Sequence, residues 1–196
     1  MKQVVSFVLL ASLGVATANA QITIWNIDKS HSQVRFSVTH LVIAEVAGRF
    51  TDFAVNFQQA GDDFTTAKIE AIIKTASINT DVERRDNHLR SGDFLDAEKY
   101  PAITFKSGAI EKTGENTYKI EGDLTIRDDT KPVVLDTKFN GTILDPYGNV
   151  KAGFKATTTI NRFDFGVKWN AATETGGLVA GSDVEITLLM EFSKAE

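Results

Sequence analysis

The sequence predicts an all-β fold built as an antiparallel meander. Two observations carry this prediction: most segments alternate apolar and polar residues with the two-residue period of half-buried strands, and short turns join these segments in series. No strand–helix–strand repeat indicates a parallel sheet. About eight to ten such strands in succession either close on themselves as a barrel or fold into two sheets.

The N-terminal segment is typical of a secretory signal peptide. Lys2 supplies a positive start, residues 4–15 form an apolar run, and residues 18–20 (ANA) form a small-residue cleavage site. We therefore expect residues 1–20 to be removed and residues 21–196 to form a single domain exported to a bacterial periplasm. No later run approaches the roughly 20 apolar residues that a transmembrane helix needs.

The predicted strands in the first half of the chain each have one apolar face. Val34, Phe36, Val38 and His40 share one face of their segment, and polar residues alternate with them. The later segments repeat this arrangement, with polar side chains outside and apolar side chains inside. The strands predicted here are residues 22–27, 33–41, 46–57 and 68–78.

The second half continues the pattern. Its clearest alternation places Tyr118, Ile120 and Leu124 opposite charged and polar neighbours. Pro146 and Gly148 lie in one connection and supply the dihedral angles of a turn, so the strands on either side should form a hairpin. The strands predicted here are residues 102–110, 118–126, 132–144, 150–160 and 184–192.

Between these halves, residues 80–101 break the two-residue rhythm and predict a short helical insertion. Thr80 and Glu83 match a capping box, so a helix should begin near Asp81 and continue to Arg90. Gly92 suits a left-handed cap at its C-terminal end.

A second turn should follow, capped by Asp93 and ended by Pro101 before the next strand. In a closed barrel, such an insertion would lie across one end as a lid. The apolar side chains expected to face inward are Val82, Leu89, Phe94 and Leu95.

Composition argues against several classes of function. The formal net charge is −5, and it becomes −6 once Lys2 leaves with the first twenty residues, so nucleic acid gains no electrostatic attraction. Without cysteine, the core and the strand ladder alone must hold the fold. An outer-membrane barrel would need aromatic girdles at the strand ends, which are not evident. The chain also lacks a phosphate-binding loop, a dinucleotide fingerprint and a G-x-S-x-G nucleophile motif.

An ordered series of short motifs runs through the whole of the expected mature chain. The motifs are WNID at 25–28, HS at 31–32, VRFSVTHL at 34–41, VAGRF at 46–50, RRDNHLRS at 84–91, DFLD at 93–96, KYP at 99–101, ITF at 103–105 and RFDFG at 162–166. By the order and spacing of these motifs, the chain resembles the YceI-like family of periplasmic proteins.

The resemblance implies an extended, lipocalin-like antiparallel β-barrel of about eight strands or slightly more, with one or two short helices near its mouth. It also implies an elongated apolar cavity that binds a polyisoprenoid or a related long-chain amphiphile. A polyprenyl chain, an isoprenoid quinone and a fatty acyl compound stay open as ligands. We expect no other cofactor, and a homodimer is compatible with the sequence.

Inward-facing apolar residues are the candidate cavity wall. Each methylene removed from water contributes about 0.8 kcal/mol, so a hydrocarbon chain can be held tightly without strong polar contacts. The same side chains could instead fill a solid barrel. The candidate ligand-binding residues of the wall and mouth are Phe36, Val38, His40, Phe50, His88, Phe94, Phe105, Leu124, Phe139, Phe154 and Phe165.

Polar candidates are few. Arg84 and Arg90 could contact a ligand head group, or they could pair with acidic neighbours along a solvated helix face. We predict no catalytic residue and no metal ligand, because His31, His40 and His88 lack the spacing of a metal site. Two alternatives stay open: a periplasmic hydrolase or metal-dependent enzyme that uses these histidines, and a stress-response interaction module with a solid core.

Overall fold

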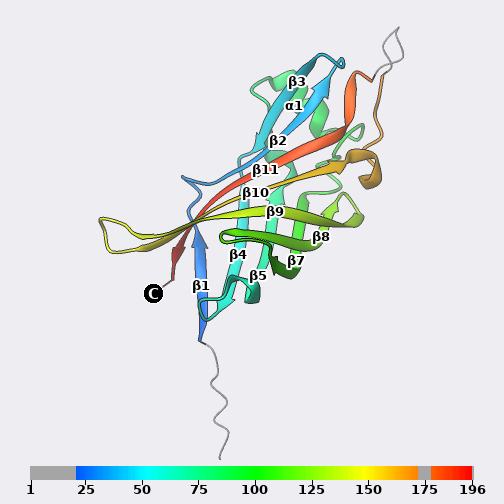
Figure 1. The fold of residues 1–196 in the computed structure, drawn as a ribbon. Helices are drawn as coiled ribbons and strands as arrows, with labels where there is room; N and C mark the ends of the chain where they lie inside the picture. Colours follow the sequence, from blue (N-terminus) through cyan, green and yellow to red (C-terminus); the bar gives the residue numbers. More distant parts are fainter. Residues whose placement is uncertain (1–20, 172–177, 196) are drawn as a thin grey trace, which may run out of the picture.

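The computed structural model describes residues 21–171 and 178–195; the predicted signal peptide, residues 1–20, lies outside this range. The described chain forms one antiparallel sheet with the strand order β1-β4-β5-β7-β8-β9-β10-β11-β2-β3-β6 (Figure 1). The strands are β1 (Ile22–Ile27), β2 (Gln33–His40), β3 (Ala44–Phe50), β4 (Phe53–Ala60), β5 (Lys68–Lys74), β6 (Ile78–Asn79), β7 (Ala102–Lys112), β8 (Thr117–Ile126), β9 (Asp129–Leu144), β10 (Val150–Asn161) and β11 (Ala180–Lys194).

The long strand β11 closes this sheet into a barrel. Its C-terminal part pairs with β1, where Ile27 lies opposite Phe192, and its N-terminal part pairs with β2, where Phe36 lies opposite Ile186. Three bent strands are therefore each made of two segments: β1 with β2, β3 with β4, and β5 with β6. Counted in this way, the barrel has eight strands, which confirms the predicted fold class.

Two predicted strands are interrupted in the structure. The prediction of one strand over residues 46–57 is wrong, because β3 ends at Phe50 and β4 begins at Phe53. Inward side chains occupy even positions up to Phe50 and odd positions from Phe53, so a single strand of period two cannot hold both sets on one face. The predicted strand 68–78 likewise divides, because the 3₁₀ turn η2 (Thr75–Ser77) separates β5 from β6.

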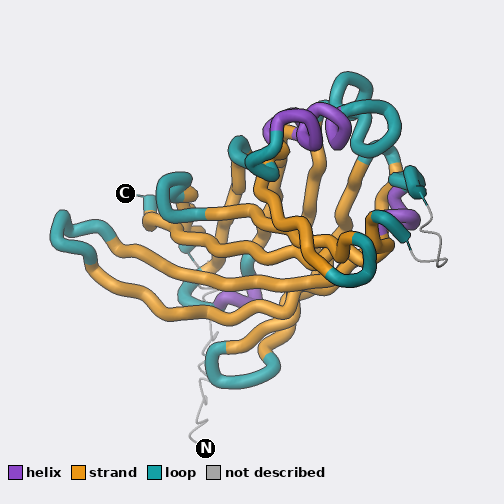
Figure 2. The backbone as a smooth tube through the Cα atoms, turned by 90° about the horizontal axis from the view of Figure 1, so that it is seen from above, coloured by secondary structure: helices purple, strands orange, loops and turns teal. Residues whose placement is uncertain are grey.

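The remaining strand predictions are confirmed with small shifts at their ends. β9 and β10 form the predicted hairpin, with Leu144 opposite Val150. This hairpin protrudes at one end of the molecule, whereas the helix and its surrounding loops gather at the other end (Figures 1 and 2). The molecule therefore has two ends with different structures.

The helix α1 (Glu83–Arg90) begins later than predicted. Its N-cap is Val82, which makes no side-chain capping bond, and the predicted capping box does not form. Instead, the Asp86 carboxylate accepts hydrogen bonds from the backbone N–H and the hydroxyl of Thr80. Asp86 therefore fixes the entry into the helix from within its first turn.

The segment after α1 is a compact turn rather than a second helix. Gly92 does not adopt the predicted left-handed conformation; the left-handed residue is Asp96, at φ 50°. The Ser91 carbonyl accepts the N–H groups of Phe94 and Asp96, and β7 begins directly after Pro101, as predicted. Val82, predicted to face inward, is exposed.

Candidate ligand-binding cavity

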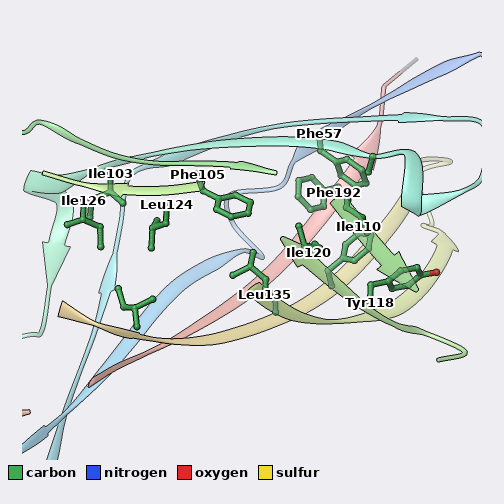
Figure 3. Close-up of a cluster of buried hydrophobic side chains, with 14 of the residues drawn as sticks. Phe57, Ile103, Phe105, Ile110, Tyr118, Ile120, Leu124, Ile126, Leu135 and Phe192 are labelled. Atoms are coloured by element: carbon green, nitrogen blue, oxygen red, sulfur yellow. The ribbon is translucent and has the colours of Figure 1, made fainter. Parts of the chain in front are cut away.

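A cavity of about 470 Å³ lies inside the barrel. Its wall consists of inward-facing side chains from β2 to β11, nearly all of them apolar. Figure 3 shows part of this wall, running from Ile103 and Ile126 at one end, past Phe105, to Phe57 and Phe192 at the other. Ligand pockets in proteins typically enclose about 300–1,000 Å³, so the interior has the size of a binding site.

Packed aromatic rings close one end of the cavity, which we call the floor. The ring of Phe57 lies 5.0 Å from that of Phe192, and the ring of Phe64 lies 5.0 Å from that of Phe154. Phe64 belongs to the 3₁₀ turn η1 (Phe64–Thr66), which follows β4. Edge-to-face and offset pairs of this kind are favourable beyond the area they bury, so the floor is a stable apolar plug.

Three further rings cover the opposite end, which we call the mouth. His88 of α1 packs edge-on against Phe94 at 4.9 Å and against Trp169 at 5.1 Å, and Phe94 and Trp169 lie 5.0 Å apart. All three residues line the cavity, together with Leu89 and Leu95. The insertion predicted to be a lid therefore covers the barrel interior.

Arg127, in the turn between β8 and β9, ties the loops of the mouth together. Its guanidinium donates to the carbonyls of Phe94 and Gly166 at 3.3 and 2.9 Å and lies 3.9 Å from the Asp96 carboxylate. Gly166 caps the 3₁₀ turn η3 (Arg162–Phe165). One side chain thus joins three loops, a role that the sequence pattern did not predict.

Arg162 holds the next part of the mouth. This buried guanidinium donates to the carbonyls of Val167, Trp169, Ala180 and Gly181 at 2.7–3.0 Å. Burial lowers the pKa of Arg162, although a guanidinium stays charged at any physiological pH. The result is a cationic group that lines an apolar cavity and fixes the segment carrying Trp169.

The predicted ligand-binding residues lie together almost without exception. Ten of the eleven line the cavity, and only Phe139 does not. The Phe139 ring stacks on Phe154 at 5.0 Å, close to the irregular pairing between β9 and β10 at Gly153. The ten lining residues are Phe36, Val38, His40, Phe50, His88, Phe94, Phe105, Leu124, Phe154 and Phe165.

The arginines predicted to contact a head group lie elsewhere. Arg84 is exposed, and Arg90 donates to the carbonyls of Ala76 and Ile78, so neither lines the cavity. Arg85 lines it instead, with its guanidinium donating to the hydroxyl and the carbonyl of Thr80. Helical periodicity indicates that Arg84 and Arg85 point in different directions, but it does not say which of the two faces the cavity.

Two glycines make room for aromatic rings in the wall. A Cβ at Gly122 would lie 2.5 Å from the Phe105 ring, and a Cβ at Gly48 would overlap the Phe36 ring. Each ring is a predicted wall residue that crosses the strand beside it. The strand glycines therefore shape the cavity surface, as close approach of a neighbouring group requires.

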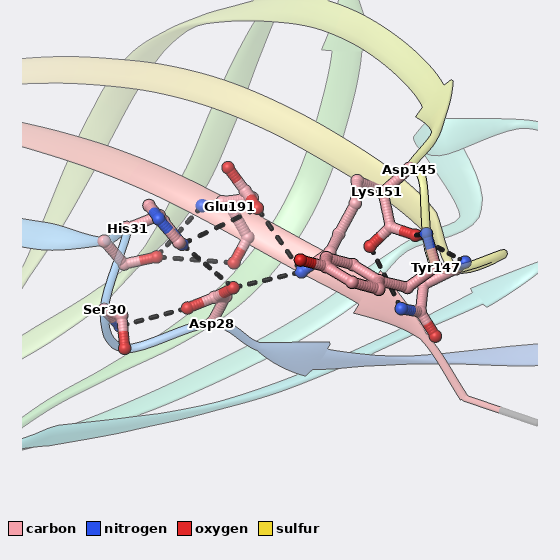
Figure 4. Close-up of polar contacts among 9 residues, drawn as sticks. Asp28, Ser30, His31, Asp145, Tyr147, Lys151 and Glu191 are labelled. Carbon is pink, nitrogen blue, oxygen red and sulfur yellow. Dashed lines mark hydrogen bonds and ion pairs between the residues drawn. The ribbon is translucent and has the colours of Figure 1, made fainter.

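Asp28, His31 and Glu191 form a polar cluster outside the cavity (Figure 4). Their ligand atoms lie within 4.8 Å of one another, and no other such group of three occurs in residues 21–171 and 178–195. The ammonium of Lys151 lies 3.0 Å from Asp28 and 3.4 Å from Glu191. A lysine therefore already supplies the positive charge that these carboxylates require.

Hydrogen bonds in and beside this cluster shift the pKa values of Asp28 and Lys151. The hydrogen bond from His31, followed by that from Lys151, lowers the pKa of Asp28 to about 2. The bond to Asp28 in turn raises the pKa of Lys151. Because Asp28 follows β1, Glu191 lies in β11 and Lys151 lies in β10, these bonds reinforce the closure of the barrel.

The three histidines have unrelated surroundings. His31 belongs to the polar cluster, His40 donates to the carbonyl of Val179 at 2.9 Å, and His88 donates to the Asp93 carboxylate at 3.0 Å. Neither His40 nor His88 has two further metal-binding side chains beside it within the described residues.

No helix in residues 21–171 and 178–195 is long and apolar enough to span a bilayer.

Comparison with known proteins places this barrel in a family. The sequence profile of the YceI-like domain matches residues 25–192. The chain belongs to the YceI-like family. A UPF0312 protein of Staphylococcus aureus is 39% identical over 175 residues, which cover 89% of this chain and 99% of that protein.

Solved structures agree with this membership. The Campylobacter jejuni YCEI protein is 33% identical, with a TM-score of 0.70 over 81% of this chain and 90% of that one. Burkholderia cenocepacia BcnA has a TM-score of 0.73 at 21% identity, covering 85% of this chain and 99% of its own. A polyisoprenoid binding domain from Saccharophagus degradans has a TM-score of 0.63 at 12% identity, covering 87% and 98%. The last two share the fold with this YceI-like chain.

Proposed function

We propose that this YceI-like protein binds the hydrocarbon part of a polyisoprenoid or a related long-chain amphiphile inside its barrel. The observation that carries the proposal is the 470 Å³ apolar cavity, which extends between the aromatic floor and the three-ring mouth. Burying an apolar chain there requires no strong polar contact, because transfer from water supplies the free energy. The polyisoprenoid binding domain of Saccharophagus degradans, which shares this fold, supports the choice of ligand class.

The polar side chains at the mouth suggest how the ligand is oriented. Arg85, His88 and Arg162 line the cavity near the mouth, whereas the floor is made of aromatic rings. A phosphate, carboxylate or quinone carbonyl would therefore lie at the mouth, where nitrogen donors can reach it, with the chain directed toward the floor. Either a polyprenyl chain or an isoprenoid quinone is compatible with this arrangement.

The proposed role is carriage or sequestration of this ligand in a bacterial periplasm, with no covalent chemistry. The signal-peptide pattern of residues 1–20 supports export. Arg85, His88 and Arg162 are engaged with Thr80, the Asp93 carboxylate and backbone carbonyls respectively, which favours binding over catalysis. The cavity also argues against the alternative of a module packed solid.

The test is to purify the exported protein from the periplasm of a producing bacterium and to identify bound compounds by native mass spectrometry and organic extraction. We expect one long-chain compound for each barrel. Ala71→Phe, which places a ring in the cavity, should abolish this binding. Ala54→Phe is the matched control, because Ala54 is exposed on the strand beside Ala71. A wild-type protein that contains no long-chain compound and takes none up would refute the proposal.

A further inference from the structure

The hairpin tip between β2 and β3 exposes three consecutive apolar side chains. Leu41, Val42 and Ile43 have exposed fractions of 41%, 66% and 88%. Single exposed apolar residues are ordinary on protein surfaces, but a contiguous group at a projecting tip is characteristic of a contact site. Between Arg35 and Arg49 the sequence contains only one charged residue, Glu45.

The fold itself disfavours these residues at this turn. Leu41 and Val42 have φ values of 50° and 68°, in the left-handed region that favours glycine and asparagine. A hairpin needing positive φ at two successive residues is most easily made by Asn-Gly. Leu-Val therefore costs conformational energy in the turn and exposes apolar surface to water, so neither folding nor solubility explains these side chains.

The tip lies beside the mouth of the cavity. The backbone N–H of Leu41 and the ring of His40 both donate to the carbonyl of Val179, at 3.0 and 2.9 Å. His40 and Val179 line the cavity, and Val179 donates in turn to Ala171, two residues beyond Trp169 of the mouth. The exposed apolar tip therefore lies next to the rim of the apolar interior.

We propose that the Leu41–Val42–Ile43 tip inserts into the surface of a phospholipid bilayer and brings the mouth to the membrane for ligand exchange. The purpose of this contact rests on the proposed function, because a water-insoluble chain needs an apolar route between bilayer and barrel. The contact itself depends only on the tip. Interfacial insertion of this kind buries apolar side chains among the lipid head groups and upper acyl chains.

Size and charge favour a bilayer over a second protein. Stable protein interfaces involve about 20–30 residues on each side, whereas this patch has three. The formal net charge, −5 for the whole sequence and −6 without residues 1–20, gives no attraction to anionic lipid, so binding should depend on apolar burial and should occur on zwitterionic vesicles. Salt should therefore change it little.

The experiment is flotation of the purified mature protein, residues 21–196, with phosphatidylcholine vesicles, with and without phosphatidylglycerol. We compare wild type with the double variant Leu41→Asn, Val42→Gly, which suits the left-handed turn. This variant should keep or raise its Tm while its vesicle partition coefficient falls by roughly tenfold or more. A loss of vesicle binding in a more stable protein excludes misfolding as the cause.

A matched control lies at the opposite end of the molecule. Ile143 and Leu144, near the tip of the β9–β10 hairpin, have exposed fractions of 69% and 66%. That hairpin points away from the end that carries α1, β2 and β3 (Figure 1). Replacing both residues by Asn should leave vesicle binding unchanged, and an equal loss in both double variants would overturn the proposal.

Other outcomes are equally decisive. Wild-type protein that does not float with either vesicle, or tip variants that float like wild type, would refute membrane docking. A concentration-dependent dimer that disappears in the tip variant, without vesicle binding, would assign the tip to a second copy and overturn the proposal. Bound lipid is measured separately, by organic extraction of the protein. A protein that binds vesicles but holds no long-chain compound in its cavity would support membrane docking and refute the carrier function.

Discussion

Replacing Asp28 by Asn tests the polar cluster that reinforces barrel closure. The Asp28 side chain is 19% exposed and accepts hydrogen bonds from His31 and Lys151 at 3.1 and 3.0 Å. These partners lower the pKa of Asp28 from 3.8 to about 2 in the folded protein. A folded pKa below the unfolded value stabilises the fold at higher pH, and that stabilisation is lost as the pH falls through the folded pKa.

The magnitude follows from the size of the shift. Each pKa unit corresponds to about 1.4 kcal/mol, so the ionised carboxylate contributes about 2 kcal/mol above pH ~5 and almost nothing below pH ~2. Asp28→Asn removes this titration. The difference in unfolding free energy between wild type and variant should therefore shrink by about 2 kcal/mol between pH ~5 and pH ~2.

The assay is urea denaturation of both proteins at several pH values across this interval. Because both chains carry all the other carboxyl groups, their common acid sensitivity cancels in the difference. Lys151→Met provides a second comparison, since removing the ammonium should raise the pKa of Asp28 and reduce the pH-dependent part. Parallel stability curves for wild type and Asp28→Asn would contradict the assigned role of the cluster.

Three further substitutions test the cavity and its mouth. Phe94→Asp should lower ligand retention, measured by extraction after dialysis, more than it lowers Tm; equal losses would make Phe94 an ordinary core residue. Arg127→Met removes two hydrogen bonds between mouth loops and should lower the free energy of unfolding by about 1–3 kcal/mol. Backbone hydrogen exchange should become faster in the turn after α1 and stay unchanged in the barrel strands. Gly122→Ala should lower the free energy of unfolding, measured by chemical denaturation, by about 1–3 kcal/mol, because the added methyl group meets the Phe105 ring. Gly108→Ala is the control: the nearest atom to its added methyl group lies 3.6 Å away, so its stability should be nearly unchanged.

The candidate cavity was largely predictable because its residues obey a local rule. A strand side chain points to one face or the other according to its position, so Phe36, Phe105 and Leu124 could be assigned to the interior from alternation. Phe139 follows the same alternation as Leu135 and Thr137, but its ring packs on Phe154 and does not line the cavity. The division of residues 46–57 was also readable, because the change from even to odd apolar positions signals a break.

The mouth was predictable in outline only. The interruption at residues 80–101 indicated a lid, yet the capping box and the Gly92 cap did not form. Caps compete with other hydrogen bonds, and here the Asp86 carboxylate takes the Thr80 hydroxyl that the capping box would use. Similarly, the inward arginine is Arg85 rather than Arg84 or Arg90, because the packing of α1 against β6 sets its rotation.

The sequence alone determined the fold class and most of the inward-facing apolar set, since strand alternation is a property of neighbouring residues. The closure of the sheet by β11 through both β1 and β2, and the cavity between the floor and the mouth, depend on contacts between remote segments. Only the tertiary structure decided that Arg127 and Arg162 join loops distant in sequence. Closure, internal volume and shared hydrogen bonds depend on how remote segments meet, which no local pattern encodes.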